Sequence, residues 1–550
     1  MRSSTGIGRA RRVLLAAAMV VLALALGACG GSDLSRTTAG EQSPSEGNAK
    51  QGDTLTIAVT APTPTLDPAL MNANPSYLWM AQLAYDPLIW YEPDGSYKPG
   101  LATKWAYVAD DNTRFELTLR SGVKFADGTP LDAEAVAASL RYAFKTGTSG
   151  PIRVPNFESA EATGPSTVLI SCSSPCGTMP IMLSQSGLVG SIISPAGLHD
   201  KKKLGSRTFG AGPYVLNAAE TVAGDHYTYD ANPAYWNRSA VHYKRVVVRI
   251  VTDPNARVSS LKSGQADIID YVPPEIAKSV ESSGMTILPE PAGTVHMIFR
   301  DRTGKPQEGD PPGAQYAPEL ANVLVRRALS YAVDRKAIVD ALGYGYSTPT
   351  AQWTAKGAGA YDPALESMYA YDPEKAKELL REAGYPNGFT LNVLTQKTNN
   401  SDRWALAIAQ YWEKIGVKVK MTTAPDLNAY FSAAPKTPVL FSQYGAGSLP
   451  YSLEAVDWYG RGGIFNAYQT ERWISKLVAK AAAAPPEEAK QLYLDINKRA
   501  MEQALNLGIA HLSYLFAYNP KKVNIPPFPE VTGAGQTANF APILTRVTPR

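Results

Sequence analysis

Residues 389–421 read FTLNVLTQKTNNSDRWALAIAQYWEKIGVKVKM, and this stretch decides the fold class. Apolar and polar residues alternate from Phe389 to Thr395 and again from Val417 to Met421, which is the period of a half-buried strand. Between them the apolar residues follow one helical face, in a helix that we expect Asp402 to cap and Gly416 to end. A strand, a helix and a strand with short connections require parallel strand pairing. The stretch therefore predicts a mixed α/β fold.

The same two periods recur outside this unit. Leu55–Val59 and Phe115–Leu119 alternate as strands. Asp132, Asp334 and Asp372 each precede an apolar helical stripe, and an aspartate in that position caps a helix. We find no internal repeat. The α/β pattern thus extends over most of the chain.

Length and charge limit the classes of function. The chain has 550 residues, 45% of them hydrophobic, and a single core rarely exceeds about 250–300 residues, so we expect at least two lobes. There are 53 basic and 49 acidic residues; residues 1–28 hold four arginines and no acid, so the remainder carries 49 of each. A neutral chain has no overall positive field, so we expect no nucleic-acid partner and no membrane binding through charge.

The N-terminus has the features of an export signal. Basic residues precede the apolar run 13–27, which is too short to span a membrane comfortably. The run ends in Leu26-Gly27-Ala28-Cys29, which matches the bacterial lipobox. We expect a lipoprotein signal peptide at 1–28, a lipidated Cys29 and a flexible tether at 29–51. Ordinary cleavage before a chance cysteine is the alternative.

Two further cysteines, Cys172 and Cys176, lie in the turn-rich stretch SCSSPCG at 171–177. In an exported protein a disulfide between them is expected, and its small loop predicts a modest stabilisation. The spacing is not that of a thioredoxin-type redox motif.

Motifs for catalysis or metal binding are missing from the sequence. The five histidines have no metal-ligand spacing, and we find neither a Gly-x-Ser-x-Gly elbow nor a Walker A sequence. We therefore expect no enzyme activity, no metal and no cofactor, which disfavours a secreted hydrolase. The chain is instead rich in Tyr (29) and Trp (9), whose flat faces and polar tips suit a ligand cleft, although most of them will lie in the core.

An ordered set of motifs runs through almost the whole chain after the tether. They are Leu66-Asp67-Pro68, Leu101–Trp105, Phe115–Gly128, Gly212-Pro213-Tyr214, Asn232–Trp236, Leu261–Ile268, Val325–Arg335 and Tyr371–Ala376. In this order they resemble the family 5 extracellular solute-binding proteins, the oligopeptide- and dipeptide-binding lipoproteins of bacterial ABC importers.

The resemblance implies an α/β, two-lobed periplasmic-binding-protein-like fold of type II, cluster C, with an extra subdomain inserted in lobe I. The chain would cross between the lobes near Gly293–Arg300 and Tyr514–Lys521. The expected boundaries are 52–88, 204–292 and 518–550 for lobe I, 89–203 for the inserted subdomain and 293–517 for lobe II.

The resemblance also implies a function. The protein would be a monomer anchored by lipid to the outer face of the cell membrane, capturing a peptide or other small solute between its lobes. It would deliver this solute to an ABC permease and its ATPase subunits. A non-peptide solute, such as a sugar, a nickel chelate or haem, and a role as a peptide-signal receptor are the alternatives.

The expected ligand contacts come partly from this resemblance. In peptide binders of the family an aspartate of lobe II pairs with the ligand amine, but the corresponding stretch 443–451 contains no acid. Glu454 or Asp457 would have to replace it. Our candidate ligand-binding residues are Asn74, Tyr77, Trp353, Tyr444, Ser448, Tyr451, Asp457, Trp458 and Tyr514.

Overall fold

The computed structural model describes a large part of the chain. The described residues are 52–71, 74–92, 96–108, 111–148, 150–300, 303–306, 310–354, 356, 360–397, 400–425, 427–444, 472–484, 486–526 and 544–550. The expected signal peptide, Cys29 and the whole of the tether at 29–51 lie outside them. No helix among the described residues is long and apolar enough to cross a membrane.

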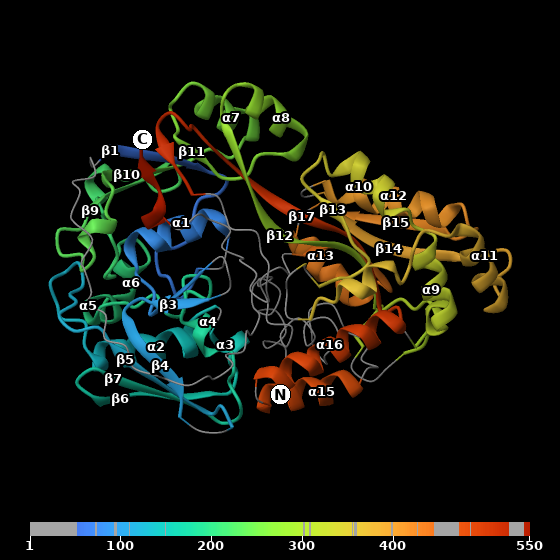
Figure 1. The fold of residues 1–550 in the computed structure, drawn as a ribbon, viewed down its shortest axis with the longest axis horizontal. Coiled ribbons are helices and arrows are strands. Elements are labelled where there is room, and N and C mark those ends of the chain that lie inside the picture. The colour runs from blue at the N-terminus through green and yellow to red at the C-terminus, as the bar shows by residue number, and fades with distance from the viewer. Residues whose placement is uncertain are drawn as a thin grey trace, which may run out of the picture.

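Eleven strands form the largest sheet, which extends through both halves of the molecule (Figure 1). The strands are β1 (Gly52–Val59), β8 (Tyr214–Leu216), β9 (His226–Ala231), β10 (Tyr243–Ile250), β11 (Ile268–Ile269), β12 (Thr286–Phe299), β13 (Thr348–Pro349), β14 (Thr390–Gln396), β15 (Lys418–Ala424), β16 (Val439–Tyr444) and β17 (Asn506–Tyr518). Their order is β15-β14-β16-β12-β17-β11-β1-β10-β9-β8, and β13 pairs with β17 beside this path.

Lobe I is built on β1, which lies parallel to both β10 and β11. Helix α1 (Pro75–Ala84) covers one face of this part of the sheet, where Ile57 joins its core. Helices α7 (Pro254–Lys262) and α8 (Pro274–Ser282) cover the other face around Ala58. The alternation of β1 therefore separates two apolar layers, as the strand pattern predicts.

A four-stranded antiparallel sheet forms a separate unit below α1 in Figure 1. Helix α2 (Ala133–Thr146) packs against it and is capped by Asp132, whose side chain accepts from the Ala135 N–H at 2.9 Å. The strands of this sheet, in spatial order, are β4 (Ala102–Tyr107), β5 (Arg114–Leu119), β7 (Thr167–Cys172) and β6 (Phe157–Gly164). The short elements around it are β2 (Ile89–Tyr91), β3 (Tyr97–Pro99), α3 (Gly150–Arg153), α4 (Met179–Met182), α5 (Pro195–His199) and α6 (Lys201–Leu204).

Lobe II contains the strand–helix–strand unit, and the predicted parallel pairing of β14 with β15 is confirmed. Its central helix is α12 (Ser401–Glu413), whose Trp412 ring is fully buried and stacks near Phe299. The other helices of this lobe are α9 (Val323–Tyr331), α10 (Arg335–Leu342), α11 (Pro373–Glu382), α13 (Leu427–Ala433), α15 (Arg472–Ala483) and α16 (Pro486–Glu502). Near the C-terminus, β18 (Val523–Asn524) pairs with β19 (Thr548–Pro549).

The predicted helix caps hold with one exception. Asp334 and Asp372 cap α10 and α11 through their side chains. The expectation for Asp402 is wrong, because α12 begins at Ser401 and Asp402 lies in its first turn. There its carboxylate accepts from the Arg403 N–H at 3.0 Å, a position in which an acid still stabilises the helix through the helix dipole.

The two longest strands, β12 and β17, pass from one lobe to the other (Figure 1). They form an antiparallel ladder from Thr286 opposite Tyr518 to Ile298 opposite Asn506. The register shifts between Pro291 and Gly293, and Gly293 has φ 141°, a backbone conformation that favours glycine. This two-stranded crossing connects the two lobes. The exact lobe boundaries stay a prediction.

Candidate ligand-binding site between the lobes

The crossing strands bring Glu290 and Tyr514 together. These residues are directly opposite each other in the β12–β17 ladder, so their side chains lie on the same face of the sheet. The next pair on that face, Leu288 and Phe516, belongs to the core beneath α1. The Glu290 side chain is fully buried, whereas Tyr514 is partly exposed. The junction of the lobes therefore presents a tyrosine above a buried carboxyl group.

Aromatic rings continue from Tyr514 into lobe I. The Tyr514 ring lies 5.2 Å from the Tyr271 ring and 5.0 Å from the Phe516 ring, measured between centroids. Phe516 meets Trp79 of α1 edge to face at 6.3 Å. Contacts of this kind hold the rings in a fixed arrangement. A solute that stacks on Tyr514 would thus rest on a rigid support.

Tyr271, Tyr514, Phe516 and Trp79 together form what we call the aromatic row. A second buried carboxyl group, that of Asp270, lies beside this row. Its Oδ2 accepts from Ser76 Oγ at 2.7 Å, and Ser76 Oγ lies 2.9 Å from Thr60 Oγ1. Its Oδ1 is 3.8 Å from Nε of the buried Arg257. Burial raises the pKa of Asp270 to about 7, although the Ser76 hydrogen bond and the Arg257 charge oppose this rise.

Both carboxyl groups act on the same tyrosine. Burial and then the Asp270 charge raise the pKa of Tyr514 well above its ordinary value, and Glu290 adds to the rise. Burial alone raises the pKa of Glu290 well above its ordinary value. The site therefore combines a neutral tyrosine hydroxyl with two carboxyl groups that are costly to ionise without a cationic partner.

The lobe II side of the junction begins at Thr294, which lies opposite His511 in the ladder. Thr294 Oγ1 donates to the Trp353 carbonyl oxygen at 3.0 Å and lies 3.0 Å from His296 Nδ1. Burial lowers the pKa of His296 to about 3 and that of His511 to about 4, so both rings are neutral at pH 7. The His511 ring meets the Tyr361 ring edge to face at 6.1 Å. The ladder therefore contributes a hydroxyl group and two neutral imidazole rings on this side.

A hydrogen-bond network fixes the chain that follows β13. The Glu366 carboxylate accepts from Thr350 Oγ1 at 2.8 Å, from the Ala351 N–H at 2.7 Å and from Gln352 Nε2 at 2.9 Å. A carboxylate with three donors is well satisfied, so this loop has a structural role around Trp353.

The structure places some of the candidate ligand-binding residues at the junction and leaves others undescribed. Asn74 caps α1, with its Oδ1 accepting from the Ser76 N–H at 2.9 Å, and Tyr77 is half-buried on the same helix. Trp353 is fully buried, and Tyr514 lies on the crossing strand as described above. Tyr444 ends β16 opposite Thr294, but its side chain is not described. Outside the described residues lie Ser448, Tyr451, Glu454, Asp457 and Trp458.

The sequence reasoning missed Asp270 and Glu290, although each left a signal. Glu290 is the only charged residue in the stretch TILPEPAGTVHMIF at 286–299, because the single histidine there, His296, is neutral. Asp270 follows the two isoleucines of β11. A lone acid in an apolar strand is unusual, because ionised carboxylates are rarely buried without a partner.

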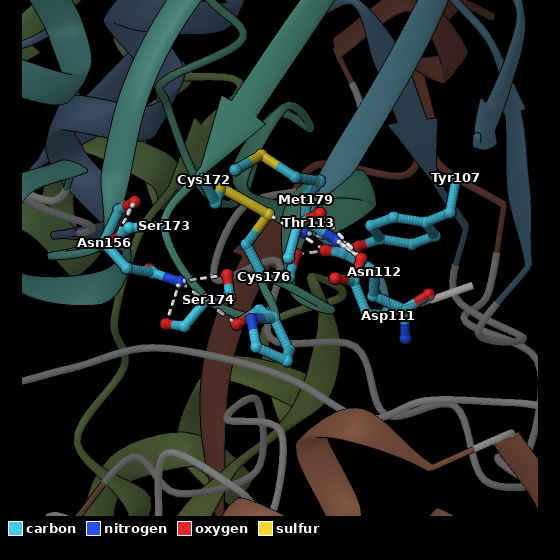
Figure 2. Close-up of a disulfide and its surroundings, with 11 residues drawn as sticks. Tyr107, Asp111, Asn112, Thr113, Asn156, Cys172, Ser173, Ser174, Cys176 and Met179 are labelled. Carbon is cyan, nitrogen blue, oxygen red and sulfur yellow. Dashed lines mark hydrogen bonds between the residues drawn. A yellow bond between two sulfur atoms is a disulfide. The ribbon is translucent and has the colours of Figure 1, made fainter. Parts of the chain in front are cut away.

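The inserted subdomain carries the disulfide shown in Figure 2. Cys172 ends β7, and its Cα lies 6.4 Å from that of Cys176. The Cys176 N–H donates to the Asn112 carbonyl at 3.0 Å, and Tyr107 Oη donates to the Cys176 carbonyl at 2.8 Å. Both cysteines are almost completely buried. The bond closes the short turn after β7, and the backbone hydrogen bonds of the two cysteines with Thr113 and Asn112 join this turn to the loop and strand that follow β4.

No group of three or more His, Cys, Asp or Glu side chains that could hold a metal ion occurs among the described residues. The junction instead combines aromatic faces with single polar groups from both lobes. A junction of this kind, at a two-stranded crossing, is a place where a two-lobed binding protein could enclose a solute.

Comparisons with known proteins agree with this class. The sequence pattern described as "Bacterial extracellular solute-binding proteins, family 5 Middle" matches residues 96–464, and the chain belongs to this family. The glutathione-binding protein GsiB of Escherichia coli (strain K12) is 30% identical over 378 residues, which cover 67% of this chain and 69% of that protein.

Solved structures share the fold. DppA of Helicobacter pylori, in complex with the peptide STSA, has a TM-score of 0.70 and 21% identity over 91% of this chain and 98% of its own. NikA of Brucella suis, in complex with Fe(III)-EDTA, has a TM-score of 0.72 and 22% identity over 90% of this chain and 100% of its own. The chain therefore has the two-lobed, type II periplasmic-binding-protein fold. Proteins of its family are extracytoplasmic, bind small solutes and work with an ABC permease and ATPase.

Proposed function

We propose that this protein captures short peptides between its two lobes and delivers them to an ABC permease. The observation that carries the proposal is the junction at β12 and β17, where the Tyr514 ring of β17 contacts Tyr271 and the neighbouring Asp270 accepts from Ser76 of α1. The peptide bound to DppA of Helicobacter pylori supports the choice of peptide as the solute.

Capture follows from the two-lobed arrangement. A solute that contacts both lobes stabilises the closed state by its difference in affinity for the closed and open states. Closure excludes water, which strengthens the hydrogen bonds to the peptide backbone. Side chains of different peptides can remain in hydrated space, which permits broad specificity.

The location of the protein is part of the proposal. Lipid on Cys29 would hold the monomer at the outer face of the cell membrane, near the permease, through the tether at 29–51. One acyl chain binds a membrane only weakly, so we expect more than one chain. The proposed lobes keep the boundaries given above, with lobe II at 293–517.

A non-peptide solute is the second candidate. The stretch 443–451 contains no acid for a peptide amine, and NikA of Brucella suis was solved with Fe(III)-EDTA. A relative with the same fold thus accepts a metal chelate.

Native mass spectrometry tests the proposal. The soluble form that begins at Gly30 is purified from its own host, and bound solutes are released and identified. A spread of peptide masses supports peptide capture. A single non-peptide mass would replace it with the second candidate. If a solute is bound but the double variant Tyr271→Ala, Tyr514→Ala retains it fully, the junction is not the site.

A further inference from the structure

Glu290 has an unusual environment for a carboxyl group. It lies in the ladder directly before the register shift between Pro291 and Gly293, where the chain passes between the lobes. Its side chain is 0% exposed. Strand alternation and the pairing with Tyr514 direct it to the same face as the aromatic row. Its place in the fold is therefore the floor of the lobe junction.

Within the part of the chain that the structure describes, the Glu290 carboxyl group has no hydrogen-bond partner. Among the described residues, neither Oε1 nor Oε2 accepts or donates a hydrogen bond. No described cation offsets its charge, since burial is the sole influence on its titration. Leaving a buried carboxylate unpaired is strongly unfavourable, and a protonated carboxyl group would still lack its hydrogen bonds.

Arg257, a buried cation of lobe I, is already engaged. Arg257 donates from Nε to the Asp270 carbonyl at 2.9 Å and from Nη2 to the Tyr271 carbonyl at 2.9 Å. Nη1 donates to the Val251 carbonyl at 2.6 Å. Its charge faces the Asp270 carboxyl group at 3.8 Å. Arg257 is thus occupied by Asp270 and by backbone carbonyls, and no ion pair joins it to Glu290.

Glu290 borders a partly exposed part of the ladder. Tyr514, its partner across the ladder, is partly exposed. The register shift and the φ of 141° at Gly293 mark the place where the strand pair can bend. A solute resting on Tyr514 would lie at the ladder position that Tyr514 shares with Glu290. A cationic nitrogen on that solute would supply the missing charge and donors together.

We propose that Glu290 is a specificity-determining residue that binds an ammonium or guanidinium group of the captured solute. The inference rests on the proposed function and narrows its substrate to solutes with a positively charged nitrogen. This nitrogen enters beside Tyr514 and pairs with Glu290 when the lobes close. Asp270 remains paired with Arg257 and Ser76 and holds the aromatic row in place.

Three equimolar tripeptide mixtures test the inference. The first is built from Ala, Gly, Ser, Leu and Phe, so the N-terminal ammonium is its sole cation. The second is the same mixture with acetylated N-termini. The third is acetylated and contains one Lys or Arg in each peptide. Native mass spectrometry measures retention of each mixture by the soluble protein beginning at Gly30 and by its variants.

The variant Glu290→Gln keeps the shape of the side chain and removes its charge. The matched control is Glu161→Gln, an exposed strand acid on β6 of the inserted subdomain. We expect the wild type and Glu161→Gln to retain the first or the third mixture about 10- to 100-fold better than the second. We expect Glu290→Gln to lose this preference. Because the preference is measured on the wild type too, a poorly folding variant does not remove the test.

Two results would overturn the inference, and they are distinguishable. If the wild type retains the acetylated, uncharged mixture as well as the charged ones, or if Glu290→Gln keeps the preference, Glu290 does not bind a cation, while peptide capture stands. If no mixture is retained, the proposed peptide capture fails and the inference fails with it.

Discussion

Raising the pH from 5 to 8 should destabilise the solute-free protein through Asp270. This side chain is 0% exposed, accepts one hydrogen bond from Ser76 and lies 3.8 Å from Arg257. Burial outweighs both interactions and raises its pKa to about 7. In the unfolded chain the same carboxyl group titrates near a pKa of about 3.9.

The sign and size of the effect follow from this difference. Because the pKa is higher in the folded state, the folded protein binds the proton more tightly, and stability falls as the pH rises. The loss accumulates between about pH 4 and about pH 7, at up to ~1.4 kcal/mol per pH unit. From pH 5 to pH 8 the contribution of Asp270 is therefore about 2–3 kcal/mol.

Guanidinium unfolding followed by tryptophan fluorescence at four pH values measures this contribution. The variant Asp270→Asn is neutral at every pH, so the unfolding free energy of the wild type minus that of the variant should fall by about 2–3 kcal/mol from pH 5 to pH 8. Asp340→Asn, whose side chain is 62% exposed, is the control and should parallel the wild type. A pH-independent difference between wild type and Asp270→Asn would refute the reasoning.

Three further predictions concern a close backbone contact, the core and the disulfide. Gly388→Ala should lower the unfolding free energy and the melting temperature strongly, since the residue has φ +71° and a Cβ would overlap the backbone oxygen of Gly416. Gly384→Ala is the control: the residue has φ +90° but a Cβ would meet open space, so the unfolding free energy should fall by only about 1–2 kcal/mol. Equal losses for the two variants would contradict the overlap. Trp412→Ala should cost at least about 3–5 kcal/mol in chemical denaturation, because the ring is fully buried and its Nε1 donates to a backbone carbonyl at 3.0 Å; a cost below about 1 kcal/mol would mean that the ring is not core. Cys172→Ser should lower the unfolding free energy by about 2 kcal/mol. A reductant should lower the melting temperature of the wild type to that of the variant, and no response to the reductant would mean that the thiols are free.

Local elements of the fold were predictable from the sequence because their signals are local. The parallel pair β14–β15 follows from two alternating strands and one helix within 389–421. Caps followed from an aspartate before an apolar stripe, as at Asp372, and the rule failed at Asp402, where an acid in the first turn resembles a cap. Helix ends are set by the chain path as well as by the capping residue.

The order of the large sheet could not be read from the residues alone. β12 and β17 pair across more than two hundred residues, and no local period indicates which distant strand is the partner. The same lack of a local signal explains why part of the site was not predicted. Tyr514 was a candidate because it is aromatic, but Asp270 and Glu290 become candidates only once the ladder and α1 place them close to Tyr514.

Hydrogen–deuterium exchange with and without a bound tripeptide tests capture between the lobes most directly. The account predicts slower exchange on both sides of the junction, in the β11 and α1 region of lobe I and along β12, β16 and β17 toward lobe II. Protection confined to one lobe, or to the inserted subdomain, would contradict capture between the lobes.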